Sequence, residues 1–319
     1  MVAIGLIVAP TEVRARDGIG APRVGVLTSG SRTALQTRVE ALRQGLRELG
    51  YIEGKTLEFD YRYADAKPER LPGLAAELVR LNVAVIVAQG TPASLAAKRA
   101  TSAIPIVMFE VGDPVGAKLV STLGKPGGNV TGLAQIGVEL YGKQFEILRE
   151  VLPNLSRVAM LWNPANPAQE RVLKAAQTAG ERLSITLLPL AVRTPVELER
   201  AIATAAQANV GAVVVSRDPV FAGLLLRVME LASERRLPVV GGHRAAAEAG
   251  GLIAYGPDST EAARRAAVYV DKLLKGASPA DLPVEQPAKF ELVVNMKAAK
   301  SLGLTIPRSV LLRTDEVIQ

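Results

Sequence analysis

Residues 83–100, VAVIVAQGTPASLAAKRA, carry the pattern that decides the fold. The five apolar residues at 83–87 form an uninterrupted run, which is typical of a strand buried on both faces of a parallel sheet. Gly90 breaks the run, and Thr91 and Pro92 then supply a side chain that can cap a helix and a ring suited to its first position. The stretch therefore predicts a strand and a helix, with free N–H groups at the sheet's carboxyl edge that can hold a small anion.

The same pattern follows three further apolar runs. The runs at 104–109, 158–162 and 212–215 are followed by Asp113-Pro114, Asn163-Pro164 and Asp218-Pro219. A capping residue plus proline is an ordinary helix start, but its repetition after four strands indicates one repeated unit. We therefore expect an α/β fold with parallel sheets and right-handed crossovers, in which a helix also follows Asp113.

Length and composition set the outer limits. A chain of 319 residues exceeds what one hydrophobic core usually supports, so two α/β lobes are expected. The absence of cysteine excludes disulfides and thiolate metal sites. The formal net charge is +7, but Arg and Lys are spread along helix faces without a dense basic run, so no nucleic-acid partner is expected.

The first 22 residues are expected to lie outside the lobes. Residues 2–10, VAIGLIVAP, have the length of a signal-peptide core but lack a basic segment before it. Residues 1–22 are therefore either a signal-peptide remnant or a disordered leader. No other stretch approaches 18 apolar residues, so we expect a soluble mature protein.

The candidate ligand-binding residues lie in loops at the carboxyl ends of the predicted strands, where open α/β sheets bind ligands. We expect backbone N–H groups and Arg217 to bind a carboxylate, and Asp113 or Asp218 to bind an ammonium group. Trp162 and Tyr255 are candidate aromatic walls, although core packing is an equally good interpretation of Trp162. The full candidate set is Ser29, Gly30, Gly90, Thr91, Asp113, Trp162, Asn163, Arg217, Asp218 and Tyr255.

Signals for catalysis are poor. The single histidine, His243, lies in a predicted loop, and no spaced cluster of histidine and carboxylates indicates a metal site. Residues 137–143, GVELYGK, match only the first part of a phosphate-binding loop, because Gln144 stands where a serine or threonine is required. No G-x-G-x-x-G follows the first strand. We therefore expect neither an enzyme nor a cofactor or metal.

Several motifs together resemble the ABC transporter substrate-binding proteins of the tryptophan/tyrosine-binding type. The resemblance runs in the same order from about Arg23 to the C-terminus. It is carried by RVGVLTSGSR at 23–32, GLRELGYIEGKTLEFDYRYADAKPERL at 45–71, VAQGTPAS at 87–94, IPIVMFEVGDPVGAKLV at 104–120, GKPGGNVTG at 124–132, GKQFEILREVLP at 142–153 and LPVEQPAKFELVVNMKAAKSLGLTIPRSVLLRTDEVI at 282–318.

This resemblance implies a type I periplasmic-binding-protein architecture, with two Rossmann-like lobes joined by a three-segment hinge. Lobe 1 would comprise residues 23–135 and about 257–285, and lobe 2 residues 136–256 and about 286–319. The hinge crossings would lie near residues 133–138, 255–258 and 283–289. The positions that would line the cleft are Thr91, Asp113, Asn163 and Asp218.

The function implied is that of an extracytoplasmic solute-binding component of an ABC importer. The lobes would close on a small carboxylate-bearing ligand, an aromatic or other amino acid or a related small acid, and present it to a membrane permease. Arg217 stands where the resemblance leads us to expect a smaller polar residue. A monomeric periplasmic protein without a lipid anchor is expected, since no cysteine lies near residue 20. A ligand-sensing regulatory domain and an α/β enzyme acting on a small molecule remain alternatives.

Overall fold

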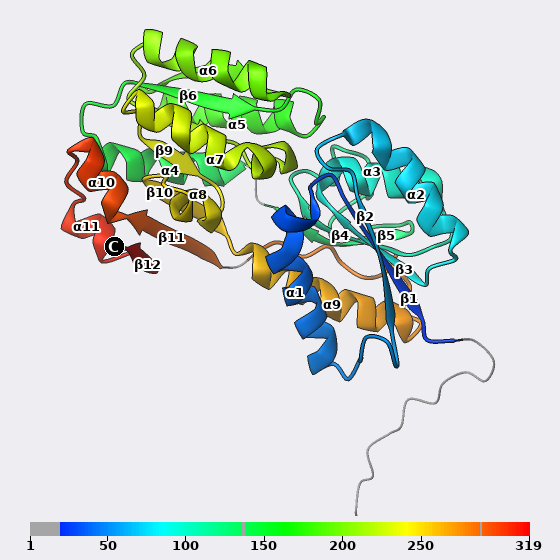
Figure 1. Cartoon of the computed structure of the whole chain (residues 1–319). Coiled ribbons are helices and arrows are strands. Elements are labelled where there is room, and N and C mark those ends of the chain that lie inside the picture. Colours follow the sequence, from blue (N-terminus) through cyan, green and yellow to red (C-terminus); the bar gives the residue numbers. More distant parts are fainter. Residues whose placement is uncertain (1–19, 136–137, 288) are drawn as a thin grey trace, which may run out of the picture.

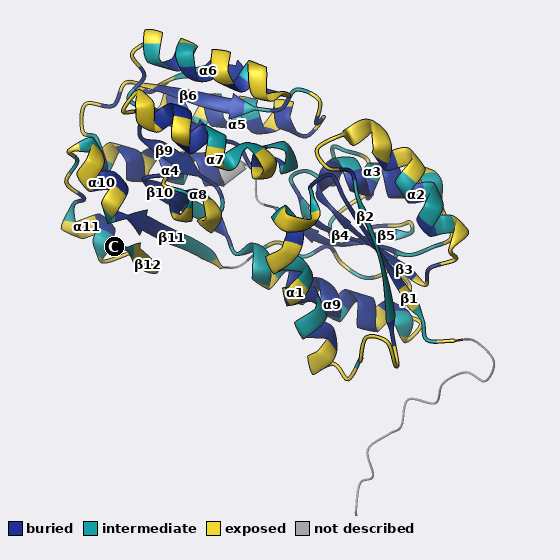
Figure 2. Ribbon diagram, viewed as in Figure 1, coloured by how far each residue is buried: buried dark blue, intermediate teal, exposed yellow. Residues whose placement is uncertain are grey.

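The apolar runs form the strands of two separate sheets, one in each lobe of the chain (Figure 1). The computed structural model describes residues 20–135, 138–287 and 289–319. In both lobes the central strands are buried between helices, and exposed residues gather on the outer faces of those helices (Figure 2). The predicted two-lobe α/β fold with parallel sheets is confirmed.

Lobe 1 contains a five-stranded parallel sheet in the order β2-β1-β3-β4-β5. One face packs against α1 and α9, and the other against α2 and α3. The strands are β1 (Arg23–Thr28), β2 (Glu58–Tyr63), β3 (Val85–Gln89), β4 (Ile106–Val111) and β5 (Val130–Ala134). The helices are α1 (Arg32–Glu48), the short η1 (Pro68–Arg70), α2 (Leu71–Arg80), α3 (Gly90–Ala100) and α9 (Ser259–Leu274).

Lobe 2 contains a seven-stranded sheet in the order β12-β11-β10-β9-β8-β6-β7. One hydrophobic core of this lobe contains residues of α4, α5, α10 and α11, and another contains residues of α6, α7 and α8. The strands are β6 (Arg157–Trp162), β7 (Thr186–Ala191), β8 (Ala212–Val215), β9 (Val239–Gly241), β10 (Ile253–Pro257), β11 (Phe290–Asn295) and β12 (Glu316–Ile318). The helices are α4 (Val138–Val151), α5 (Gln169–Arg182), α6 (Pro195–Gln207), α7 (Pro219–Glu234), α8 (Arg244–Glu248), α10 (Met296–Leu302) and α11 (Arg308–Leu311).

The structure differs from the prediction at several elements. Strand β11 runs antiparallel to β10, so the second sheet is mixed rather than wholly parallel, and β12 extends its edge. Residues 114–118 form turns instead of the helix expected after Asp113. Helix α3 begins at Gly90, so Thr91 lies in its first turn rather than capping it. Only Asp218-Pro219 begins a helix as the pattern predicted.

The chain passes between the lobes at three places, which follow β5, β10 and the segment after α9. The first and third expected hinge crossings, at 133–138 and 283–289, include residues 136, 137 and 288, which lie outside the described residues. Helix α9 follows β10 of lobe 2 but packs on lobe 1 beside α1 (Figure 1). Within the described ranges 20–135, 138–287 and 289–319, no helix has the length and apolar character needed to cross a membrane.

Candidate functional site

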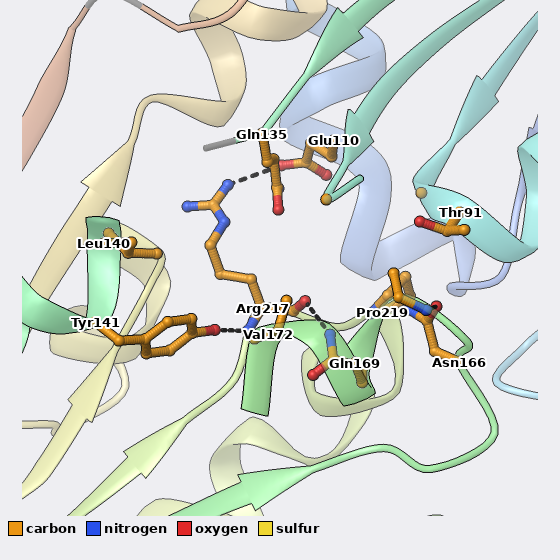
Figure 3. A pocket seen from close by; sticks show the side chains of 13 residues that line it. Thr91, Glu110, Gln135, Leu140, Tyr141, Asn166, Gln169, Val172, Arg217 and Pro219 are labelled. Carbon is orange, nitrogen blue, oxygen red and sulfur yellow. Dashed lines mark hydrogen bonds and ion pairs between the residues drawn. The ribbon is translucent and has the colours of Figure 1, made fainter. Parts of the chain in front are cut away.

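A cavity lies between the two lobes, at the carboxyl ends of strands from both sheets (Figure 3). The space inside it that is open to the centres of water molecules is only about 20 Å³, so the walls of the two lobes lie close together here. Lobe 1 and the segment that leaves it contribute Gly90, Thr91, Glu110, Gly112 and Gln135 to the lining. Lobe 2 contributes Leu140, Tyr141, Asn166, Ala168, Gln169, Val172, Arg217 and Pro219.

The N-terminus of α3 opens into this cavity. The N–H groups in the first turn of a helix have no partner within the helix, and here no described side chain caps them. Gly90 has a φ of +78°, and a Cβ built there would lie 3.3 Å from Cγ of Pro219 in lobe 2. Glycine at this position therefore permits both the turn from β3 into α3 and the close approach of the lobes. The hydroxyl-bearing side chain of Thr91 follows on the cavity wall (Figure 3).

Across the cavity, Gln169 in the first turn of α5 presents a polar group without a partner. Its Nε2 donates to the backbone oxygen of Arg217 at 3.0 Å. Its Oε1 is buried and has no hydrogen-bond partner among the described residues. A buried unpaired acceptor is costly, so a ligand donor at this oxygen would be favourable. The neighbouring Tyr141 hydroxyl accepts from the backbone N–H of Arg217 at 3.4 Å, and burial raises its pKa to about 12, so it remains neutral.

The Arg217 side chain rises from the β8–α7 loop through the middle of the lining (Figure 3). Its guanidinium group lies against Glu110 of lobe 1, with Nη2 3.5 Å from Oε1, and is almost completely buried. Burial lowers its pKa to about 10, which still leaves the group protonated at neutral pH. The charge is thus already matched by a protein carboxylate. Arg217 lines the cavity as expected, but its charge faces Glu110 rather than open space.

Glu110 is the carboxylate that holds these groups together. Its Oε1 accepts from Nε of Arg38 at 3.2 Å, and its Oε2 accepts from Nε2 of Gln89 at 2.6 Å. Burial alone would raise the pKa of Glu110, but the guanidinium charges of Arg38 and Arg217 hold it well below its usual value. Glu110 is therefore ionised over the whole physiological range.

Asp218 does not line the cavity. It caps α7, where its carboxylate accepts from the backbone N–H of Val220 at 3.0 Å. The side-chain amides of Asn163 and Asn166 donate to its two oxygens at 2.9 Å and 2.7 Å. Burial raises the pKa of Asp218, and these three donors oppose that shift. The expected role in binding an ammonium group therefore has no geometric support, because the oxygens already have partners.

The other predicted residues are not among those that line the cavity. Asp113 of lobe 1 forms an ion pair with Arg171 of α5 in lobe 2. Ser29 is buried without a partner for its hydroxyl among the described residues, and the N–H of Gly30 donates to Thr28. Trp162 is half-buried at the end of β6 and is not part of the lining. Tyr255 stacks on Phe290 with ring centroids 5.7 Å apart, in a separate groove beside α4 and α5.

Sequence reasoning missed several residues that line the cavity. Tyr141 and Gln169 lie in the first turns of helices, where no local signal distinguishes them from ordinary helix residues. Glu110 had a signal, since it is a charged residue between Phe109 and Val111 in an apolar run. A carboxylate in an otherwise buried strand needs a partner, and that partner is provided by distant parts of the chain.

Three comparisons bear on what this chain is. A solved conserved domain protein from Vibrio cholerae is 31% identical and aligns with a TM-score of 0.89 over 93% of this chain and 99% of its own. A domain from Streptococcus pneumoniae solved in complex with L-Trp is 27% identical, with a TM-score of 0.88 over 94% and 100%. A tyrosine-binding protein of Clostridioides difficile (strain R20291) is 23% identical over 297 residues, which are 93% of this chain and 85% of that protein. A model of the family described as ABC transporter substrate binding protein matches residues 23–318, and the chain therefore belongs to this family.

Proposed function

We propose that this chain binds an amino acid with an apolar or aromatic side chain for an ABC importer. The observation that carries this proposal is the pairing of two opposite polar features in one cavity. The uncapped N-terminus of α3 offers N–H groups to a carboxylate, and the unpartnered Oε1 of Gln169 accepts from an ammonium group. A zwitterionic ligand satisfies both features at once.

The rest of the lining suits an apolar ligand side chain. Leu140, Ala168, Val172 and Pro219 supply aliphatic surface, and the ring of Tyr141 lies beside Arg217 (Figure 3). Apolar surface combined with a few placed polar groups is typical of small-molecule recognition. The name of the tyrosine-binding relative and the L-Trp complex of the solved relative support an aromatic amino acid as the first ligand to test.

The lobes would close on this ligand as two bodies. We take residues 23–135 with about 257–285 as one body and residues 136–256 with about 286–319 as the other. The packing of α9 on lobe 1 and the pairing of β11 with β10 in lobe 2 support this division. A ligand that contacts both lobes stabilises the closed arrangement over the open one. We propose that a monomeric protein in the periplasm closes in this way and delivers the ligand to a membrane permease.

The proposal is tested by a thermal-shift screen of amino acids and small aromatic acids, followed by calorimetry. A ligand at one hundred times its Kd stabilises the folded protein by about 2.7 kcal/mol, which gives a clear rise in Tm. We expect L-Trp or L-Tyr to give such a rise and to be recovered chemically unchanged. A screen in which no amino acid raises the Tm would contradict the proposed ligand class.

The site itself is tested by Thr91→Val, which keeps the shape of the side chain and removes its hydroxyl. Loss of one hydrogen bond to a charged ligand group costs about 1.5 to 3 kcal/mol, so we expect at least tenfold weaker binding. Thr186→Val, at an exposed position of β7, provides the matched control and should bind as tightly as the original protein. Equal affinities of the two variants would remove Thr91 from the site.

A further inference from the structure

The guanidinium group of Arg217 contacts both lobes and the segments that join them. Its Nη1 donates to the backbone oxygens of Gly242 in lobe 2 and of Pro257, where the chain leaves that lobe. Its Nη2 donates to Oε1 of Glu110 in lobe 1 and, at 3.2 Å, to Oγ of Ser259, the first residue of α9. A single side chain thus contacts four residues, in three segments, on the two sides of the cleft.

The remaining donor of Arg217 also has a partner at a hinge crossing. With the amide of Gln135 oriented to place its oxygen toward the guanidinium, this oxygen accepts from Nε at 3.1 Å and from Nη2 at 3.0 Å. The five N–H groups of an arginine are then all accounted for by protein acceptors. A ligand carboxylate could reach Arg217 only by displacing one of them.

Two glycines leave the space that the Arg217 side chain occupies. A Cβ on Gly242 would lie 2.3 Å from Cγ of Arg217, and a Cβ on Gly256 would lie 2.7 Å from its Nη1. Any larger residue at either position would force the side chain to move. The two side chains of the Arg217–Glu110 pair are only 4% and 6% exposed, and Arg38 and Gln89 complete the contacts of Glu110.

A second ion pair joins the same two lobes but differs in its exposure. Arg171 of α5 pairs with Asp113 of lobe 1 at 2.5 Å, with 68% of the arginine side chain exposed. Exposed ion pairs contribute little because water competes for both partners, whereas separating a buried pair leaves uncompensated charge. The two pairs therefore offer a matched comparison of buried and exposed contacts across one cleft.

We propose that Arg217 is a positioning residue that, with Glu110, holds the lobes in the closed arrangement instead of binding the ligand. Part of the free energy of closure is then provided by the protein itself, and ligand affinity depends on this pair without direct contact. The inference goes beyond the proposed ligand, because it concerns the balance between open and closed lobes in any state of the protein.

The test measures the distance between the lobes directly. Because the chain has no cysteine, Lys67→Cys in lobe 1 and Arg200→Cys in lobe 2, both exposed, give two unique sites for spin labels. In the ligand-free protein we expect a population at the closed distance, which Arg217→Met should remove by shifting the distances to longer values. We expect Arg171→Met to leave the distribution unchanged. With L-Trp or L-Tyr, whichever binds, Arg217→Met should bind at least tenfold more weakly and Arg171→Met within twofold of the original protein.

Two results would overturn this inference. The first is the absence of a closed population in the ligand-free protein. The second is an unchanged distance distribution in Arg217→Met, even if that variant binds the ligand more weakly. Weaker binding with unchanged distances would show that Arg217 contacts the ligand. If Arg217→Met fails to fold, Glu110→Gln keeps the side-chain shape, removes the charge and should shift the distances in the same direction. Because the distances are measured without ligand, failure of the proposed ligand class leaves this test intact.

Discussion

Glu110, Arg217 and His243 lie in one cluster, and the charge state of each depends on burial and on the charges of the others. Burial lowers the pKa of Arg217 to about 10 and that of Glu110 is held below its usual value, so the pair stays ionised at neutral pH. Burial and the charge of Arg217 lower the pKa of His243, whose Nδ1 lies 2.9 Å from Oγ of Ser259. The histidine is therefore neutral and adds no charge to the cluster. The charges of this buried cluster are therefore those of one carboxylate, Glu110, and two guanidinium groups, Arg38 and Arg217.

These charges predict how the acid stability of the protein depends on Glu110. The pKa of this carboxyl is lower in the folded than in the unfolded protein, so the unfolded state binds more protons as the pH falls. The contribution of Glu110 is fully present above its unfolded pKa of about 4.3 and is lost as the pH falls below it. Glu110→Gln should therefore be less stable than the original protein at pH 7, with a difference that shrinks toward pH 2.

Denaturant unfolding at a series of pH values measures this effect. Glu181→Gln is the control, because Glu181 is exposed on α5 and makes no ion pair among the described residues. We expect this control to follow the curve of the original protein. A stability difference between Glu110→Gln and the original protein that stays constant from pH 7 to pH 2 would show that the carboxylate charge is not the source.

At the scale of elements, the junction of β3 and α3 brings the backbone of lobe 1 close to Pro219 of lobe 2. Its turn requires a positive φ at Gly90, and the same residue faces Pro219 across the cleft. Gly54 has almost the same φ, +79°, but a Cβ there would meet nothing within 4 Å. Substitutions at these two glycines therefore distinguish the cost of backbone strain, which both share, from the cost of crowding between the lobes, which only Gly90 has.

We predict that Gly90→Ala and Gly54→Ala each lower the free energy of unfolding by about 1 kcal/mol, because alanine disfavours a positive φ. Only Gly90→Ala should weaken ligand binding, because only its new methyl group would crowd Pro219 when the lobes close. Each kcal/mol that this crowding costs should weaken binding about fivefold. Denaturant unfolding and calorimetry measure the two effects separately. Equal ligand affinities in the two variants would mean that the lobes need not approach at Gly90.

The sequence predicted most elements because their signals are local. Buried strands appear as apolar runs, and the start of α7 follows from a capping aspartate and a proline. At α3 the same pattern misplaced the start, because Gly90 with its positive φ already turns the chain into the helix. The direction of β11 could not be read from its composition, since pairing depends on the neighbour that the fold brings beside it.

The cavity was only partly predictable for a related reason. Loops at strand ends supplied Gly90, Thr91 and Arg217, because the carboxyl edge of a parallel sheet is defined by topology. Whether a polar residue there is free or already paired depends on the segments that the fold brings beside it. Asp113 is taken by Arg171 and Asp218 by two asparagines, while Gln169 is left with an unpaired oxygen.

At the scale of the whole molecule, the cavity belongs to neither lobe alone. The family resemblance is confirmed by a model that spans both lobes, and membership of a family of binding proteins agrees with the prediction that the chain is not an enzyme. The lining comes from β3–α3 and β4 on one side and from α4, α5 and β8–α7 on the other. A ligand bound among these residues would be enclosed, so entry requires the lobes to separate.

This requirement predicts that a covalent link between the lobes blocks ligand exchange. A Cβ built on Gly112 of lobe 1 would lie 4.0 Å from Cβ of Ala168 in lobe 2, which suits a disulfide, and both residues line the cavity. The chain has no other cysteine to compete. We expect Gly112→Cys with Ala168→Cys, once oxidised without ligand, to take up no ligand in calorimetry and to recover binding on reduction.

The same variant can be oxidised after the ligand has bound. Dialysis should then remove the ligand only when a reductant is added, because the closed lobes leave no route out. Each single-cysteine variant supplies the control, since it has the same side-chain change but cannot form the link, and it should exchange ligand freely under oxidising conditions. Free exchange through the oxidised double variant would show that the ligand enters without separation of the lobes, and closure about the hinge would then play no part in binding.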